Sequence, residues 1–331
     1  MTRFIFFLIL LLAIRLVLFT FFSPRTETIT KSAWRETSIF VQIKDHIKDS
    51  YIKYLPAQDA ALLMGIVFGD KDLDHSSMKQ FKDTGVLHII AASGMNVSML
   101  IEFVLVFLLL FLKRPYALII TAGIVIFYAA LGDFQASIVR ASIMGLIALG
   151  AGITGRQNTS LLALFYAAWV MIFWDPTIVA SISFILSFCA TLGIVLLDPV
   201  LKQMSLRGWV LEDFRTTLSA QIATTPILLF FFGNYSPISI ITNLLVLWTV
   251  PLLMVFGMVA AVLSFISDYL AAPLIYICLP LLSYFWMVIE FFAKIAYPLE
   301  IKNIPWSIVV GYYLLLGGII LQINKNKPMN K

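Results

Sequence analysis

Long hydrophobic runs, separated by short polar stretches, occupy most of the chain up to residue 323. Most of these runs have about 17–25 residues, the length that an α-helix needs to cross the hydrocarbon core of a bilayer. They predict spans at residues 4–22, 95–112, 115–131, 136–153, 159–173, 178–197, 214–232, 238–265, 270–297 and 306–323. The predicted fold class is therefore all-α, a polytopic transmembrane helix bundle of about ten spans.

The stretch between the first two predicted spans has mixed polarity. Five apolar residues recur there at helical spacing, with Lys and Asp residues on the opposite side: Phe40, Ile43, Ile47, Tyr51 and Tyr54. A second apolar face follows at Ala60, Leu63, Met64, Val67 and Phe68, closed by Gly69, and a third helix is expected between Asp74 and Gly85. This periodicity predicts amphipathic helices at the outer surface of the membrane or of the bundle.

Composition excludes a soluble globular protein. Of the 331 residues, 61% are hydrophobic and only 12% are charged, whereas soluble domains carry about 25% charged residues. Three histidines are too few for a His-rich zinc centre. Cys189 and Cys278 lie in apolar runs, which suit buried thiols better than a disulfide or a metal site. We therefore predict no metal and no cofactor.

The positive charges follow a membrane topology and form no concentrated basic patch. The net charge is +5, and the basic residues are spread along the chain. With a cytoplasmic N-terminus, most loops on the inner side carry Lys or Arg, whereas the short outer loops at Asp133, Asp175 and Asn234 carry neither. Short loops of membrane proteins show this bias. The prediction is a multi-pass protein with both termini in the cytoplasm.

One stretch, residues 73–111, does not have the pattern of a plain membrane helix. It begins polar and becomes apolar, yet the apolar part contains five residues that a simple span does not need: His88, Ser93, Gly94, Asn96 and Glu102. Glycine lets the backbone leave the helix, and serine can bond the freed backbone groups. Irregular backbone at membrane depth is tolerated only inside protein or beside a wet cavity. We predict a segment that breaks at Ser93-Gly94 and lines a polar path.

Further polar residues fall inside predicted spans, where they are costly and usually face the bundle interior. Arg140 either reaches the outer interface or forms a cationic site on the path, and Glu102 is its candidate partner. Glu290 and Lys294 are spaced i, i+4 and are expected to form an ion pair within one helix. Gln221 precedes Pro226, and Asn243 precedes Pro251, so both mark broken or kinked helices.

Four blocks of this sequence resemble, in order, the ComEC-type competence membrane proteins. The first block is residues 81–97, Phe-Lys-Asp-Thr-Gly-Val-Leu-His-Ile-Ile-Ala-Ala-Ser-Gly-Met-Asn-Val. The others are 132–144, with Ser137 and Arg140 at matching places, 175–188, which begins Asp-Pro, and 221–251, which contains Gln221, Asn243 and Pro251. The resemblance implies a bacterial cell-membrane protein that passes single-stranded DNA into the cytoplasm.

This chain also departs from that family. Members commonly have a histidine where Asn96 stands, and many carry an oligonucleotide-binding domain and a metallo-β-lactamase-like domain. Residues 23–92 show no strand-rich pattern, and no His-x-His-x-Asp-His run occurs. The chain also has no zinc-ligand cluster, and no histidine outside His88 lies in a span to act as a base for Ser93. We therefore expect that this chain is not an enzyme and that any nuclease is a separate chain.

The predicted function is a channel for single-stranded DNA during natural transformation, and the alternative is a transporter of a small solute or lipid-linked substrate. The predicted pore-lining or DNA-binding residues are His88, Ser93, Gly94, Asn96, Arg140, Gln221 and Asn243. The domains are a first transmembrane helix (1–22), extracytoplasmic amphipathic helices (23–92), a channel bundle (93–323) and a basic cytoplasmic tail (324–331). Membrane lipid, a cytoplasmic motor and a DNA receptor are the expected partners, and the sequence leaves the oligomeric state open.

Overall fold

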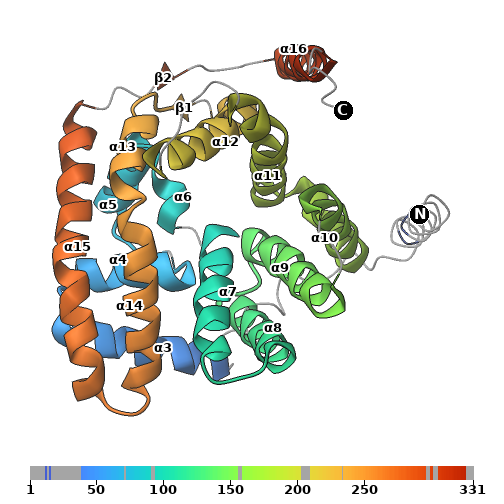
Figure 1. Ribbon diagram of the computed structural model, residues 1–331. Helices are drawn as coiled ribbons and strands as arrows, with labels where there is room; N and C mark the ends of the chain where they lie inside the picture. The colour runs from blue at the N-terminus through green and yellow to red at the C-terminus, as the bar shows by residue number, and fades with distance from the viewer. Residues whose placement is uncertain are drawn as a thin grey trace. The chain divides into compact units, whose positions relative to one another are not determined.

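The computed structural model describes residues 12, 15, 39–70, 72–90, 94–155, 159–202, 209–232, 234–295, 299–300 and 305–325. The described chain is almost wholly helical (Figure 1), which confirms the all-α class. It divides into two compact units, the first comprising Met1–Asp74, His88–Ser181 and Thr249–Trp286, and the second His75–Leu87, Ile182–Trp248 and Met287–Lys331.

The first unit contains α3 (Ile39–Tyr54), α4 (Ala57–Phe68), α7 (Gly94–Leu109), α8 (Arg114–Leu131), α9 (Ala136–Thr154), α10 (Ser160–Trp174), the 3-10 helix η1 (Pro176–Ala180), α14 (Thr249–Ser264) and most of α15 (Asp268–Ile295). The second contains α5 (His75–Asp83), α11 (Ile182–Leu201), α12 (Trp209–Phe232), α13 (Ser239–Val246) and α16 (Trp306–Lys325). The short α6 (Leu87–Ile90) begins at the last residue of a second-unit segment. Strands β1 (Asn234–Tyr235) and β2 (Leu299–Glu300) pair antiparallel, with Asn234 opposite Glu300.

The helices begin and end close to the predicted spans, but the number of spans is not confirmed. Among the described residues, four helices are long and apolar enough to cross a membrane, namely α8, α9, α11 and α15, and the pair α13 and α14 makes a fifth if it counts as one span. Helices α4, α7 and α10, and the part of α16 from Trp306 to Ile320, are apolar but shorter. The predicted span at 4–22 lies, apart from Leu12 and Arg15, outside the described residues.

The predicted two-part segment at 238–265 is confirmed, although Pro251 does not make the break. Helices α13 and α14 form a bent pair, and Leu247 and Trp248 lie between them. Pro251 is the third residue of α14. The first four N–H groups of a helix have no partner within it, so a proline there removes no helical hydrogen bond.

Helix α3 is amphipathic, as predicted, and buries one face. Ile47 and Tyr51 on this face are buried, and the Tyr51 hydroxyl donates to the carbonyl oxygen of Gly257 in α14 at 2.7 Å. A tyrosine ring in an apolar interior needs such an acceptor for its hydroxyl. The contact fixes the C-terminal part of α3 against the middle of α14.

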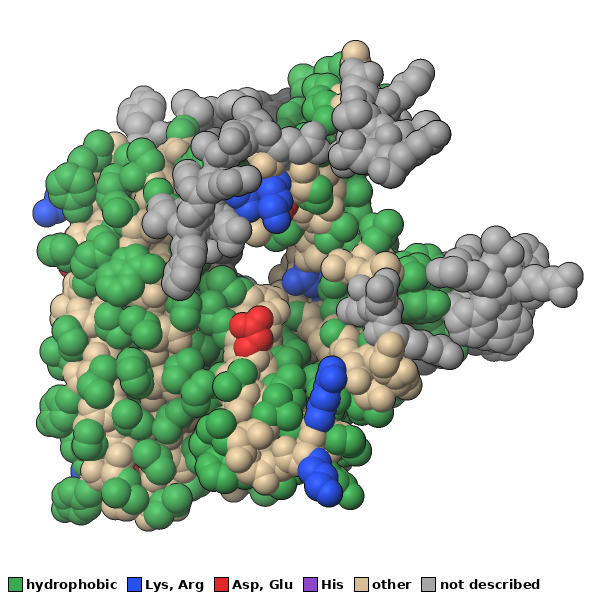
Figure 2. Space-filling view, viewed as in Figure 1, with side chains coloured by type: hydrophobic (Ala, Val, Ile, Leu, Met, Phe, Trp, Pro, Cys, Tyr) green, Lys and Arg blue, Asp and Glu red, His purple; other side chains and the backbone are tan. Residues whose placement is uncertain are grey.

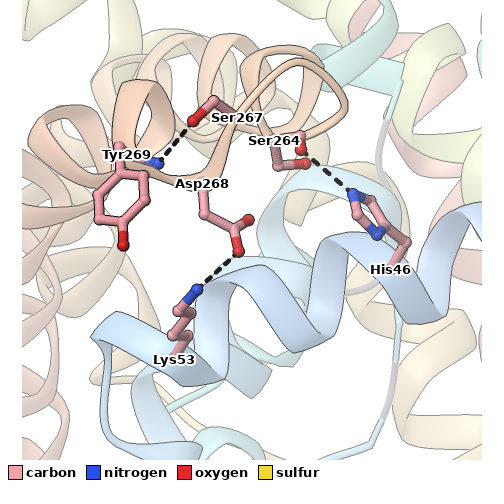
Figure 3. A network of polar contacts seen from close by, with 6 residues as sticks. All are labelled: His46, Lys53, Ser264, Ser267, Asp268 and Tyr269. Atoms are coloured by element: carbon pink, nitrogen blue, oxygen red, sulfur yellow. Dashed lines mark hydrogen bonds and ion pairs between the residues drawn. The ribbon is translucent and has the colours of Figure 1, made fainter.

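Three lysines of α3 form ion pairs with aspartates in three different segments of the first unit. The ion pairs are Lys44–Asp133 at 2.6 Å, Lys48–Asp72, and Lys53–Asp268 at 2.9 Å. Figure 3 shows Lys53 directed at Asp268 and His46 directed at the carbonyl oxygen of Ser264, 3.3 Å away. Hydrogen bonding to Asp72 and Asp268 raises the pKa of Lys48 and of Lys53, respectively. Exposed ion pairs contribute little to stability because solvent screens the charges, so they align α3 more than they stabilise it.

Helix α4 differs from its prediction as a helix with one apolar face. Every residue from Leu62 to Phe68 is buried, including Leu62, Gly65 and Ile66, which lie outside the predicted face. A helix that is apolar all round belongs in an interior. The spacing of the larger apolar residues, three and four positions apart, suggested a single apolar face. The structure instead packs α4 against α3 and α14, and its C-terminal end contacts the side chains of Asn96, Tyr128 and Gln135 described below.

Large hydrophobic side chains are exposed over the outer faces of the long helices. On α14, α15 and the turn between them, Val262, Phe265, Ile266, Tyr269 and Leu270 are all exposed. Figure 2 shows hydrophobic side chains spread over the visible face of these helices. In water such a face would be strongly unfavourable, whereas in a bilayer it meets lipid tails. The fold is that of a multi-pass membrane protein.

In the second unit, α16 supplies hydrogen-bond donors to α12 just before its internal proline. Pro226 has no N–H, so the carbonyl oxygen of Ile222 loses its helical partner. The Tyr312 hydroxyl donates to this oxygen at 2.9 Å, and the Tyr313 hydroxyl donates to Ala223 O at 2.5 Å. Prolines are tolerated in membrane helices when neighbouring groups bond the freed carbonyls in this way.

We expect Tyr312→Phe to lower the thermal stability of the purified protein, because it leaves Ile222 O without its donor. The loss should be about 0.5–1.5 kcal/mol, the net contribution of a typical hydrogen bond, because this hydrogen bond is exposed at the protein surface. The matched control is Tyr116→Phe, which removes an equivalent hydroxyl from an exposed side chain of α8. Equal melting temperatures for the two variants in detergent micelles would contradict this role of Tyr312.

Candidate functional site

The first unit brings together two of the predicted site residues, Gly94 and Arg140. Gly94 is the first residue of α7, and Arg140 lies in the second turn of α9. A Cβ atom added to Gly94 would overlap Nη2 of Arg140 and would lie 3.4 Å from the Cβ of Ala141. The guanidinium therefore lies directly over the start of α7, in a place that only a glycine leaves free.

Arg140 is nearly buried, with 7% of its surface exposed. Arginine inside a membrane bundle is costly, and such residues usually mark an ion or substrate path. The sequence left open whether Arg140 reaches the interface or belongs to an inner site. Its burial places the guanidinium inside the first unit, beside Gly94, and its depth relative to the membrane interface stays a prediction.

Asn96 lies in the first turn of α7 and is completely buried. Its Nδ2 donates to the carbonyl oxygen of Ile66, in the last turn of α4, at 2.7 Å. The side chain also hydrogen-bonds the Tyr128 side chain. Asn96 was predicted to line a path, and the structure places it in contact with the end of a neighbouring helix.

Two polar residues that the sequence reasoning missed contact the same end of α4. The Tyr128 hydroxyl, in α8, donates to Val67 O at 2.6 Å, and Nε2 of Gln135 donates to Gly69 O at 3.1 Å. A tyrosine in the middle of an apolar run was the available signal for the first, since its buried hydroxyl requires a partner. Gln135 lies five residues before Arg140, and this closeness was the available signal for including it among the predicted site residues.

The corner that presents Gln135 has a strained backbone. Asp133 and Phe134 have φ values of 54° and 50°. Asp tolerates this left-handed region, but a bulky residue such as phenylalanine rarely adopts it. Strain of about 1–3 kcal/mol persists only where surrounding contacts hold it, and here the Lys44–Asp133 ion pair and the Gln135–Gly69 hydrogen bond flank the corner.

The second unit holds Gln221 and Asn243 in a separate polar cluster. Nε2 of Gln221, in α12, donates to the Ser239 hydroxyl at the start of α13 at 3.1 Å. Gly85, in the left-handed region with φ 72°, packs so closely on Ser239 that an added Cβ would overlap the serine side chain. Ser239 was not predicted. Its signal was the position four residues before Asn243, on one helical face.

Asn243 is 1% exposed, and its Oδ1 has no hydrogen-bond partner among the described residues. The Ser236 hydroxyl, near the start of the same helix, is also buried without a partner in the described part of the chain. Buried polar atoms are usually hydrogen-bonded, and unmatched ones point to water or another polar group at the site. The face of α13 that carries Ser239 and Asn243, together with Ser236 just before the helix, is therefore polar although it is buried.

Neither predicted ion pair is among the four that the described residues form. Glu102 is exposed on α7, whereas Arg140 is buried in α9, so the two side chains do not meet. Glu290 and Lys294 are both exposed on α15. Ion pairing between exposed side chains on a helix surface is weak, and i, i+4 spacing permits a contact without enforcing it.

Two predicted residues cannot be placed. The backbone of His88 belongs to α6, but its side chain and all of Ser93 lie outside the described residues. Helix α6 ends at Ile90 and α7 begins at Gly94. Two separate helices on either side of residues 91–93 are consistent with the predicted break at Ser93-Gly94. The predicted roles of His88 and Ser93 in lining a path stay predictions.

Comparison with known proteins adds a family relationship. The family model described as "Competence protein" matches residues 66–326. A protein of Aquifex aeolicus (strain VF5), described as uncharacterized, is 28% identical over 290 residues, which cover 86% of this chain and 64% of that protein. ComE operon protein 3 of Bacillus subtilis (strain 168) is 24% identical over 225 residues, or 67% of this chain and 29% of that protein.

The chain thus spans less than two thirds of the length of either relative. No solved structure matches it significantly. All the site residues described above, from Ile66 to Asn243, lie within the region that the family model matches. The relationship therefore covers both units.

Proposed function

The chain belongs to the competence protein family, and from this premise we propose that it provides the membrane path for single-stranded DNA during uptake. The family model that matches the chain is described as "Competence protein", and one of its relatives is named ComE operon protein 3. The observation that carries the proposal is the buried Arg140 guanidinium over Gly94. DNA has one phosphate per nucleotide, and arginine is the side chain best suited to bind phosphate inside protein.

Two further features support this proposal. Transport paths at membrane depth are commonly lined by interrupted helices. The backbone groups that the interruption frees must face protein or water, as they do beside such a path. The break between α13 and α14 is an interruption of this kind, and the proline within α12 removes one helical hydrogen bond. Neutral amides and hydroxyls such as Gln221, Ser239 and Asn243 would suit the uncharged edges of bases, while Arg140 would contact the backbone.

The proposal has consequences for topology and partners. Both termini lie in the cytoplasm, and the protein acts as a conduit and not as an enzyme. Since a conduit supplies no energy, a cytoplasmic motor draws the strand inward and a DNA receptor delivers it from outside. A nuclease that removes one strand acts as a separate chain or domain.

Deleting the gene tests the function directly. We expect transformation with selectable DNA to fall to the background of a no-DNA control, because the proposed membrane path is then missing. Complementation with the intact chain should restore it. Normal transformation in the deletion strain would remove DNA as the substrate, and loss of uptake of a small solute or lipid-linked molecule would then favour the transporter alternative.

A further inference from the structure

The C-terminal end of α4 is held by side chains from three other segments. The last carbonyl groups of a helix have no partner within it. Here Gly69 ends the helix in the left-handed conformation, with its N–H bonded to Gly65 O. Three of the remaining carbonyl oxygens accept from distant side chains: Ile66 from Asn96, Val67 from Tyr128, and Gly69 from Gln135. We call these three donors the α4 anchor.

Two of the three donors of the α4 anchor, Asn96 and Tyr128, are buried in the interior of the unit, and Gln135 is half-buried. Ile66, Val67 and Asn96 are fully buried, and Tyr128 is 2% exposed. An unsatisfied carbonyl in such surroundings is unfavourable, so each of these hydrogen bonds strongly restrains the helix that supplies the donor. Because the donors come from α7, α8 and the residue that precedes α9, one helix end fixes the relative positions of three helices.

Two members of the α4 anchor adjoin the candidate site in sequence. Asn96 lies two residues after Gly94, and Gln135 lies five residues before Arg140. The approach of the Arg140 guanidinium to Gly94 leaves no room even for a methyl group. A shift of the first turn of α7 or of α9 would therefore move Arg140 away from this position.

We propose that Asn96, Tyr128 and Gln135 are positioning residues, which act through the end of α4 to hold Arg140 where a phosphate of the passing strand meets it. This inference rests on the proposed function. The three side chains do not touch DNA. They set the distance between the starts of α7 and α9, and this distance determines where the guanidinium lies.

The first test measures geometry and needs no DNA. Cysteines are introduced at Ser98 in α7 and Ala148 in α9, both exposed positions, and are spin-labelled in a background in which Cys189 and Cys278 are replaced by serine. Pulsed electron–electron double resonance gives the distance distribution between the labels. Tyr128→Phe, which removes only the hydroxyl, should shift or broaden this distribution. The control Tyr116→Phe should leave it unchanged.

The second test measures uptake of labelled single-stranded DNA at equal protein level. Tyr128→Phe should raise the half-saturating DNA concentration roughly tenfold, because it removes the buried hydrogen bonds of the Tyr128 hydroxyl to Val67 O and to the Asn96 side chain. In a protein that already carries Arg140→Lys, Tyr128→Phe should raise the half-saturating DNA concentration by much less than tenfold. The guanidinium that Tyr128 positions is absent from that background. Fully additive effects would show that Tyr128 acts on stability alone and would overturn the proposal.

Gln135→Glu keeps the test decisive if Tyr128→Phe does not accumulate. Glutamate has the same shape but no N–H to donate to Gly69 O, and the position is only half-buried, so folding should tolerate it. Unchanged spin-label distances and unchanged uptake in this variant would overturn the proposal. If Arg140 itself proves dispensable for uptake while the distances still shift, the positioning role is overturned and the α4 anchor is only structural, whereas the proposed function fails only if the deletion strain transforms normally.

Discussion

Arg140→Ala is expected to abolish uptake of labelled DNA while the amount of protein in the membrane stays unchanged. The side chain is buried and lies over the first residue of α7. A phosphate that enters the bundle loses part of its hydration, and a buried cation compensates for much of this desolvation. Without Arg140 the barrier should rise by several kcal/mol, which corresponds to a loss of about a thousandfold or more in rate.

The controls separate charge from position. Arg114→Ala removes one positive charge from an exposed residue at the start of α8 and should leave uptake within about twofold of the wild type. Arg140→Lys keeps the charge but loses the planar fork that binds phosphate with two hydrogen bonds, so it should retain partial uptake. Wild-type uptake by Arg140→Ala at equal expression would exclude Arg140 from the mechanism.

Gly193→Ala is expected to have the largest effect on stability. Gly193, in α11, faces α12 so closely that an added Cβ would overlap the Cβ of Ala223 and lie 2.8 Å from Ser219 O. The carbonyl belongs to the backbone of α12 and cannot rotate away, so the two helices must separate. We expect a loss of about 1–3 kcal/mol, the usual effect of overpacking a tight core, visible as a lower melting temperature in detergent.

Gly123→Ala is the matched control, because Gly123 lies within α8 with nothing within 4 Å of an added Cβ. An alanine there should be neutral or should stabilise the helix by up to about 1 kcal/mol. Equal melting temperatures for the two alanine variants would mean that α11 and α12 do not pack as closely as described.

The helices could be predicted because lipid imposes a simple rule on sequence. Each span must be apolar over its length, so α8, α9 and α15 begin and end within a few residues of the hydrophobic runs. Helix α4 escaped this rule. It is too short to cross a bilayer, and its apolar residues resemble the inner face of a surface helix until the structure shows that all sides are covered.

The candidate site was predicted only in part. Gly94 and Arg140 were correctly identified as unusual residues within apolar runs, yet their mutual contact depends on how α7 packs against α9 and leaves no local signal. The hydrogen bonds of Asn96, Tyr128 and Gln135 join residues 30, 61 and 66 positions apart. The spacing of apolar residues carries no information about a partner so far away in the sequence. Asn96 was therefore predicted to line a polar path, and Tyr128 was not predicted as a site residue.

The distant donors at the end of α4 imply an order of assembly during synthesis. Helix α4 leaves the ribosome first, but Gln135, which bonds the carbonyl of Gly69, follows 66 residues later. Until then the exposed carbonyls favour contact with water or lipid headgroups over the hydrocarbon core. We infer that the C-terminal end of α4 stays beside water or lipid headgroups until Asn96, Tyr128 and Gln135 have been synthesised, and that it is buried only after these donors have bonded its carbonyls.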